Sequence, residues 1–229
     1  MRTTPIIALD VPGMEQALAV VDLLGDRCRF YKIGNELFTA VGPRVVQEVR
    51  GRGCEVFLDL KFHDIPNTVA GGVRNATRLG ARLVTVHATG GTAMLKAAVD
   101  AAGESCGVLA VTVLTSMDAR DAGMVWGRTD NVNLTTEVLR LAATSAEAGT
   151  HGIVCSGREA GAVQKQFGAS LAILVPGVRA LGGDSQDQAR VVTPRGAADA
   201  GARYIVVGRM VTAAANPATA MDQLLRELA

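Results

Sequence analysis

The sequence EVFLDL at residues 55–60 runs directly into KFHDIPNT at residues 61–68. The first segment is mainly apolar and short, which indicates a buried strand. Apolar residues then recur with a helical period over Val69–Leu79, which predicts a helix. A strand followed at once by a helix is the repeating unit of an α/β fold.

The same order recurs along the whole chain. Strands are predicted at Pro5–Asp10, Arg29–Gly34, Glu55–Leu60, Leu83–His87, Val108–Leu114, Gly152–Cys155, Leu171–Val175 and Tyr204–Val207. Helices are predicted at Met14–Leu24, Arg44–Arg50, Val69–Leu79, Thr92–Ala102, Leu134–Ala148, Glu159–Phe167, Arg195–Ala200 and Ala218–Leu228. The strands are nearly continuous apolar runs, which is typical of a parallel sheet covered by helices on both faces.

Eight such units in 229 residues fit a closed (β/α)₈ TIM barrel that forms a single domain over residues 1–229. A doubly wound open sheet is the alternative, because periodicity does not distinguish the two. In a barrel, we expect the working residues at the carboxyl ends of the strands.

The composition of the chain excludes several classes of protein and of binding partner. Hydrophobic residues make up 48% of the chain and charged residues 20%, which excludes global disorder. The 23 basic and 22 acidic residues nearly balance, so we expect no nucleic-acid partner and no anionic membrane. We find neither a signal peptide nor an apolar run of ~18 residues, and we expect a cytoplasmic protein. The four cysteines are widely spaced, which predicts reduced core thiols.

Charged residues lie in or at the ends of three of the predicted strands. Side chains alternate along a strand, so Asp59 and Lys61 should share one face, which in a barrel is the interior. Buried charges are costly unless they are paired or used. Lys32 lies within a second apolar strand, Asp10 ends the first, and Asp64 follows in a loop. A helix cap for Asp10, or a purely structural ion-pair network, is the alternative to a polar site at the barrel mouth.

Two glycine-bearing stretches follow late strands. They are the loop from Pro176–Arg179 to Gln188 and the segment Val207–Arg209. Barrel enzymes often hold a phosphate on such loops, although an ordinary surface loop is equally consistent with either stretch alone.

The segment DLKFHDIPNT at residues 59–68 closely resembles the signature of the orotidine 5′-phosphate decarboxylase family, Asp-x-Lys-x-x-Asp-Ile-x-x-Thr. The resemblance runs nearly end to end. It takes in ALD at 8–10, KIG at 32–34, VTVLTS at 111–116, PGVR at 176–179, DQAR at 187–190 and VVGR at 206–209.

The resemblance implies a cofactor-free, metal-free enzyme of pyrimidine (UMP) biosynthesis. Such an enzyme converts orotidine 5′-phosphate to uridine 5′-phosphate and CO₂, and it acts as a homodimer whose sites are shared across the interface. By matching position, Lys61 would donate a proton to C6, Asp59 would face the substrate carboxylate, and Lys32 would act with them. Asp64 would enter the neighbouring subunit's site.

The remaining residues implied by the resemblance bind parts of the substrate. Asp10 and Lys32 would hold the ribose hydroxyls, and Arg179, Gly208 and Arg209 the phosphate. The set also includes Ile65, Thr68, Thr115, Ser116, Pro176 and Gln188.

Three rivals remain. A Mg²⁺-dependent sugar-phosphate decarboxylase or aldolase of the same superfamily would typically place an acidic metal ligand where this chain has Lys32. A non-catalytic phosphate-binding barrel would be expected to lose Lys61 or Asp59. A metal-dependent hydrolase would use Asp59, His63 and Asp64, with Lys61 a poor neighbour for its metal. We assign His63 a packing or loop role, because a lysine already serves as proton donor.

Overall fold

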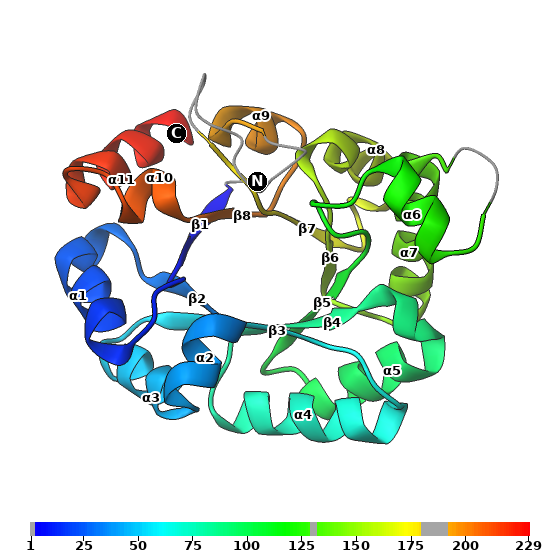
Figure 1. Ribbon diagram of the computed structural model, residues 1–229, viewed down its shortest axis with the longest axis horizontal. Coiled ribbons are helices and arrows are strands. Elements are labelled where there is room, and N and C mark those ends of the chain that lie inside the picture. Colours follow the sequence, from blue (N-terminus) through cyan, green and yellow to red (C-terminus); the bar gives the residue numbers. More distant parts are fainter. Residues whose placement is uncertain (1–2, 129–131, 180–191) are drawn as a thin grey trace.

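The computed structural model describes residues 3–128, 132–179 and 192–229. Eight parallel strands close into a barrel in chain order, with β1 paired to both β2 and β8 (Figure 1). The strands are β1 (Thr4–Ala8), β2 (Phe30–Gly34), β3 (Glu55–Phe62), β4 (Leu83–His87), β5 (Gly107–Val111), β6 (Gly152–Val154), β7 (Ala172–Val175) and β8 (Tyr204–Val207). Closure between β1 and β8 confirms the predicted TIM barrel and excludes the open sheet.

Helices surround the barrel. They are α1 (Met14–Leu24), α2 (Asn35–Val41), α3 (Arg44–Gly51), α4 (Pro66–Arg78), α5 (Gly91–Ala102), α6 (Ala119–Val125), α7 (Leu134–Glu147), α8 (Gly157–Phe167), α9 (Pro194–Asp199), α10 (Arg209–Thr212) and α11 (Pro217–Glu227), with short 3₁₀ turns η1 (Gly25–Arg27) and η2 (Ala88–Gly90). Helices α2, α6 and α10 were not expected from the sequence. Their seven, seven and four residues are too short to show a helical period.

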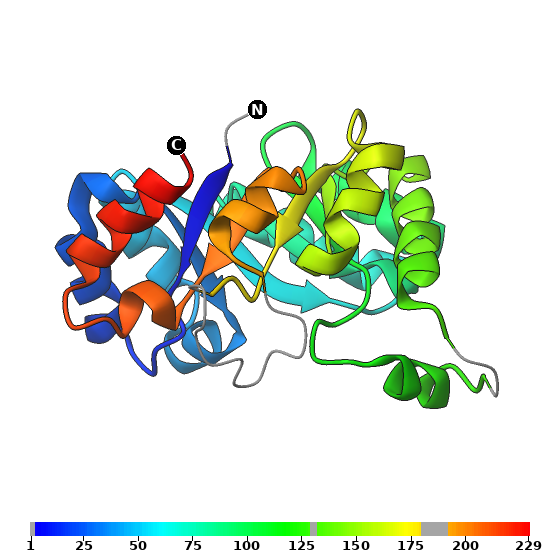
Figure 2. The same ribbon diagram turned by 90° about the horizontal axis from the view of Figure 1, so that it is seen from above.

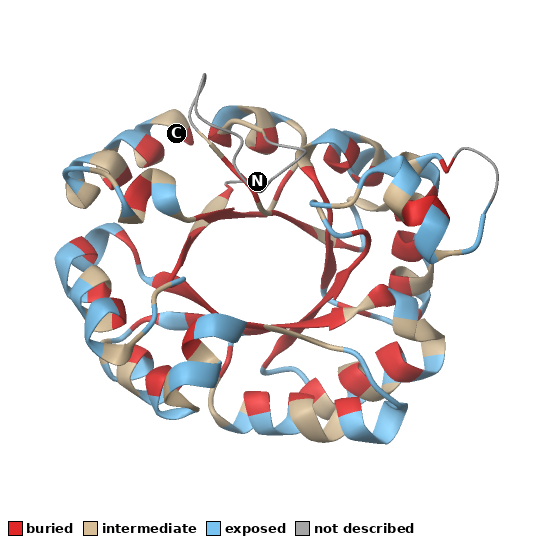
Figure 3. Ribbon diagram, viewed as in Figure 1, coloured by how far each residue is buried: buried red, intermediate tan, exposed pale blue. Residues whose placement is uncertain are grey.

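The chain buries two apolar layers, one between the strands and the helices and one inside the barrel. The strands are buried along most of their length, whereas the helices expose their outer faces (Figure 3). The inner layer comprises Ile6, Ala8, Phe30, Phe57, Leu83, Leu109, Val111, Val154, Leu174, Tyr204 and Val206. The interior formed by the described strands is therefore a packed core and not an open channel.

None of the four cysteines forms a disulfide and all four are buried, in agreement with the reduced core thiols predicted from the sequence. Burial raises the pKa of Cys28 to about 11, so its thiol stays protonated near neutral pH. In the described part of the chain, no helix has both the length and the hydropathy needed to cross a membrane.

Helix α6 stands away from the barrel body (Figure 2). The chain after it is attached to α7 by Glu137, which is buried and accepts hydrogen bonds from Arg128 (2.6 Å) and Arg140 (2.9 Å). Burial alone would favour the neutral acid, but these two hydrogen bonds outweigh it and lower the pKa of Glu137. The segment around Met124 and Trp126 therefore includes a helix, and the chain just after it is held to α7 by the ion pairs of buried Glu137.

Close packing of β6 against β7 requires a glycine at Gly152, because a Cβ there would overlap the carbonyl oxygen of Ala172. We expect Gly152→Ala to lower the free energy of unfolding by about 1–3 kcal/mol and to lower Tm accordingly. Gly161→Ala is the matched control. It lies on an exposed face of α8 with nothing within 4 Å of the added methyl, so it should keep or slightly raise Tm. Equal Tm values for the two variants would contradict this account.

Candidate active site

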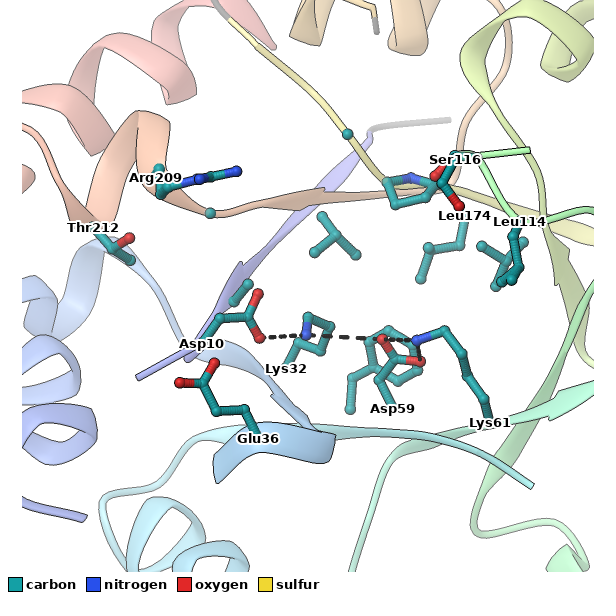
Figure 4. Close-up of a pocket in the computed structure, with 18 of the residues that line it drawn as sticks. Asp10, Lys32, Glu36, Asp59, Lys61, Leu114, Ser116, Leu174, Arg209 and Thr212 are labelled. Atoms are coloured by element: carbon teal, nitrogen blue, oxygen red, sulfur yellow. Dashed lines mark hydrogen bonds and ion pairs between the residues drawn. The ribbon is translucent and has the colours of Figure 1, made fainter. Parts of the chain in front are cut away.

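Four charged side chains of alternating sign form a row at the carboxyl ends of β1, β2 and β3 (Figure 4). Lys32 donates to Asp10 across 2.7 Å between Nζ and Oδ1, and its Nζ lies 3.8 Å from Oδ2 of Asp59. Lys61 then donates from Nζ to both oxygens of Asp59, each at 2.9 Å. Each of the two inner charges, Lys32 and Asp59, thus has a partner of opposite sign on both sides.

The row belongs to the layered filling of the barrel. Lys32 lies two residues beyond Phe30 on β2, and Asp59 lies two residues beyond Phe57 on β3. Phe30 and Phe57 belong to the inner apolar layer, and side chains two apart share a face of a strand. Lys32 and Asp59 are therefore the next layer up, with only about 10% and 12% of their side chains exposed.

The regular alternation of side chains along a strand does not explain the contact between Lys61 and Asp59. Among the described residues it is the one non-glycine residue with a positive φ, 52°. The pairing of β3 with β4 also shifts register between Leu58 and Phe62. The expectation that Asp59 and Lys61 face the same space is met, but a bulge in β3 brings them together rather than a regular extended strand.

The row forms one side of a cavity of about 590 Å³ at the mouth of the barrel. Its floor is the top of the inner apolar layer, including Ala8, Phe57 and Val206. Arg209 lies across the cavity from the row (Figure 4). The cavity thus combines an apolar floor, an acid–lysine wall and a cationic wall, which suits an anionic molecule that also has an apolar part.

Most residues selected from the sequence meet in this cavity. Its lining includes Asp10, Lys32, Asp59, Lys61, Thr115, Ser116, Pro176, Arg179, Gly208 and Arg209. Gln188 lies outside the described residues, as does most of the loop that contains it.

Asp64, Ile65 and Thr68 do not line the cavity of their own chain. They belong to a run of six consecutive exposed residues, 63–68, between β3 and the first turn of α4. Ile65 is 67% exposed although it is a large apolar residue. Asp64 Oδ1 accepts a hydrogen bond from the backbone N–H of Ile65 at 2.6 Å.

Sequence reasoning missed Glu36 and Thr212, which also line the cavity. Each belongs to a short helix that directly follows a strand, α2 after β2 and α10 after β8. The signal that could have found them is their position, because the segments after strands form the working face of a barrel. Figure 4 shows the Glu36 carboxylate beside that of Asp10.

Two histidines lie next to the row. The rings of His63 and His87 are 5.2 Å apart between centroids and tilted by 34°. Burial, together with nearby His63 and Lys61, lowers the pKa of His87, so its ring is neutral near pH 7. Neither ring lines the cavity, which agrees with a packing or loop role for His63.

The fold and the cavity together define a (β/α)₈-barrel enzyme with an electrostatically organised site for an anionic substrate. Residues 3–224 match the Orotidine 5′-phosphate decarboxylase / HUMPS family. The chain therefore belongs to that family.

Individual relatives agree with this assignment over nearly the whole chain. Orotidine 5′-phosphate decarboxylase of Halorhodospira halophila is 45% identical, with 98% of this chain and 95% of the relative covered. The enzyme of the same name from Pseudomonas syringae pv. syringae is 43% identical, with 100% and 98% covered. The crystal structure of orotidine 5′-phosphate decarboxylase from Lactobacillus acidophilus superposes with a TM-score of 0.86 at 33% identity, with 100% of this chain and 99% of that chain covered.

The lowered pKa of His87 makes stability depend on pH. Between its pKa in the folded chain and ~6.5 in the unfolded chain, the unfolded state binds more protons, so stability falls as pH falls through that window. When the pH is lowered from 7.5 to 5.5, we expect the Tm of His87→Asn to fall less than the Tm of the parent protein, as measured by thermal unfolding. Tm at pH 7.5 serves as the reference for effects of the substitution itself. An unchanged difference between the two pH values would show that His87 does not contribute.

Proposed function

We propose that Lys61 protonates C6 of the pyrimidine in the decarboxylation of orotidine 5′-phosphate to uridine 5′-phosphate and CO₂. This is the reaction of pyrimidine biosynthesis that the chain catalyses as a member of its family. One observation carries the assignment of roles. The Lys61 ammonium is held at 2.9 Å from both oxygens of Asp59, at the edge of a cavity that also contains two arginines.

The chemistry requires a fixed positive charge. When the bond between C6 and the carboxylate breaks, its electron pair stays on C6, and no ring carbonyl can conveniently delocalise it. An ammonium placed beforehand at that position stabilises the developing charge, because its environment needs no reorganisation during the reaction. Lys61 then donates a proton to C6, and its neutral amine regains a proton from water.

Asp59 has two roles in this proposal. It holds Lys61 in place, and it lies beside the substrate carboxylate. Two carboxylates ~3.5 Å apart repel by roughly 5 kcal/mol at an effective dielectric constant of ~20. The repulsion disappears as CO₂ leaves, whereas the attraction between Asp59 and Lys61 persists. We assign the larger part of catalysis to the preorganised charges, since ground-state repulsion is a contested source of rate.

The other cavity residues bind the non-reacting parts of the nucleotide. We assign Asp10 and Lys32 to the ribose hydroxyls, and Thr115 with Ser116 to the base. Pro176 and Gly208 shape the wall on which Arg179 and Arg209 hold the phosphate, and Gln188 either touches the base or bridges to the phosphate. All of these except Gln188 line the cavity. Binding energy from the phosphate can then serve to order the site and exclude water.

The position of Lys32 disfavours the magnesium-dependent rival. Its ammonium lies between Asp10 and Asp59, at 2.7 Å and 3.8 Å from their oxygens. That is the space between two carboxylates that a divalent cation would have to occupy, and the lysine charge repels such a cation. We therefore propose a reaction without a metal, and the family resemblance implies that it needs no organic cofactor either.

We also propose a homodimer that works in the cytoplasm. Asp64 with Ile65 and Thr68 extends outward from the cavity of its own chain, and the exposed Ile65 offers an apolar contact for a second copy. These residues would complete the partner's site. The four buried cysteines, none of them in a disulfide, support a reducing compartment. The single domain over residues 1–229 is likewise a proposal, supported by the barrel that spans the described residues.

The test of the function is the absorbance change of orotidine 5′-phosphate on decarboxylation, followed with purified protein in excess EDTA. We expect full activity in EDTA and a loss of more than ~10³-fold in kcat for Lys61→Ala, which removes both the charge and the proton donor. The exposed Lys96 on α5 provides the control, and Lys96→Ala should leave kcat unchanged. A flat trace from folded parent protein would overturn the function, and dependence on added Mg²⁺ would favour the rival.

Sharing of the site is tested by mixing two inactive variants, Lys61→Ala and Asp64→Ala. If Asp64 serves the partner's cavity, a heterodimer contains one site with both native residues. Random exchange of subunits should therefore restore up to about one quarter of the parent activity per site. Exchange is verified with subunits that carry different tags. Proven exchange without any recovery would place the action of Asp64 within its own chain.

A further inference from the structure

Thr85 lies beneath the charged row without being part of it. It is in the middle of β4, has no exposed surface, and does not line the cavity. Its hydroxyl donates to Oδ1 of Asp59 at 2.9 Å and accepts from the backbone N–H of Lys61 at 2.9 Å. A single uncharged oxygen therefore contacts both residues to which the proposed function assigns the chemistry.

The register between β3 and β4 explains why this contact exists. Leu58 pairs with Val84 and Phe62 pairs with Val86, so the three residues 59–61 of β3 lie opposite Thr85 alone. Such a bulge removes backbone groups from the regular ladder of hydrogen bonds. A backbone N–H that is withdrawn from water and left without a partner is costly, and the Thr85 hydroxyl supplies the partner for Lys61.

The two hydrogen bonds also fix each other's direction. A threonine hydroxyl has one proton and accepts through its lone pairs. Because the Lys61 N–H points at the oxygen, the hydroxyl proton is left to point at Asp59. The same contact thus holds the Lys61 backbone in its left-handed conformation, φ 52°, and orients the Asp59 carboxylate.

We propose that Thr85 is a positioning residue for decarboxylation, whose hydroxyl holds the Lys61 backbone and the Asp59 carboxylate in the geometry that brings the Lys61 ammonium to C6. The inference rests on the proposed function. It adds a residue that touches neither substrate nor solvent and that acts through the two charged groups. Because small misplacements of reacting groups are costly in rate, losing the hydroxyl should slow the chemical step more than it weakens binding.

The experiment compares Thr85→Val, which keeps the shape and removes the hydroxyl, with Thr85→Ser, which keeps the hydroxyl. We expect Thr85→Val to lower kcat by about 10- to 100-fold with KM changed less than about three-fold, and Thr85→Ser to stay within about three-fold of the parent in both. Thr150→Val is the matched control. Thr150 is also buried, and its hydroxyl contacts the carbonyls of Ser145 and Gly152 at the opposite end of the barrel.

A second readout isolates the proton transfer from CO₂ release. In D₂O, exchange of the C6 hydrogen of uridine 5′-phosphate reverses the proposed protonation and depends on Lys61 alone among the proton donors. We expect Thr85→Val to slow this exchange in parallel with kcat, and Thr150→Val to leave it unchanged even where Tm falls. If Thr85→Val does not fold, Thr85→Cys, which replaces the hydroxyl with a weakly hydrogen-bonding thiol and removes the methyl group, takes its place.

The outcomes separate this inference from the proposed function. Parent protein without decarboxylase activity would overturn the proposed function. Active parent protein with a Thr85→Val kcat within three-fold of it would overturn the role of Thr85. A Thr85→Ser variant as slow as Thr85→Val, or a Thr150→Val variant slowed to the same extent, would show that packing matters rather than the hydroxyl. Slow exchange in Thr85→Val with rescue in Thr85→Ser would support the inference.

Discussion

Buried charges in this protein must alternate, and that constraint organises the carboxyl end of the barrel. Lys32 and Asp59 occupy a layer that apolar side chains fill just below, and they are almost as inaccessible to solvent. Removing one member of such a pair would leave an uncompensated charge, which is strongly destabilising. Asp10 and Lys61 therefore extend the row outward to the partly exposed rim, where the last charges on each side can be solvated.

The alternation of charges also places the proposed proton donor before the substrate binds. Lys61, held by Asp59, is in position before any substrate arrives, so little reorganisation is needed when negative charge develops on C6. The barrel supplies rigid strands for Asp59 and Lys61, while arginines on the far side of the cavity follow β7 and β8. The reacting groups and the anion-binding arginines thus come from different strands of one closed sheet. Each set can therefore change with little effect on the other.

The predicted elements and the charged row could be recognised because they leave local signals. Apolar runs of four to eight residues mark strands, and a lysine or aspartate within such a run stands out. Glu36 and Thr212 left no such signal, since their helices are short and their residue types are common on surfaces. Thr85 is equally inconspicuous in LVTVH, because threonine is an ordinary strand residue. Its importance arises only from what lies opposite it on β3.

Residue order was sufficient to predict eight strand–helix units and to indicate which charges would be brought to one end of a barrel. It also placed Asp59 and Lys61 on one side of β3, although by an argument from regular alternation. Tertiary pairing decided the rest. Closure of β1 on β8 and the bulge opposite Thr85 both depend on contacts between residues distant in the chain. Local patterns report how each segment folds, whereas register and closure depend on how the segments pack against one another.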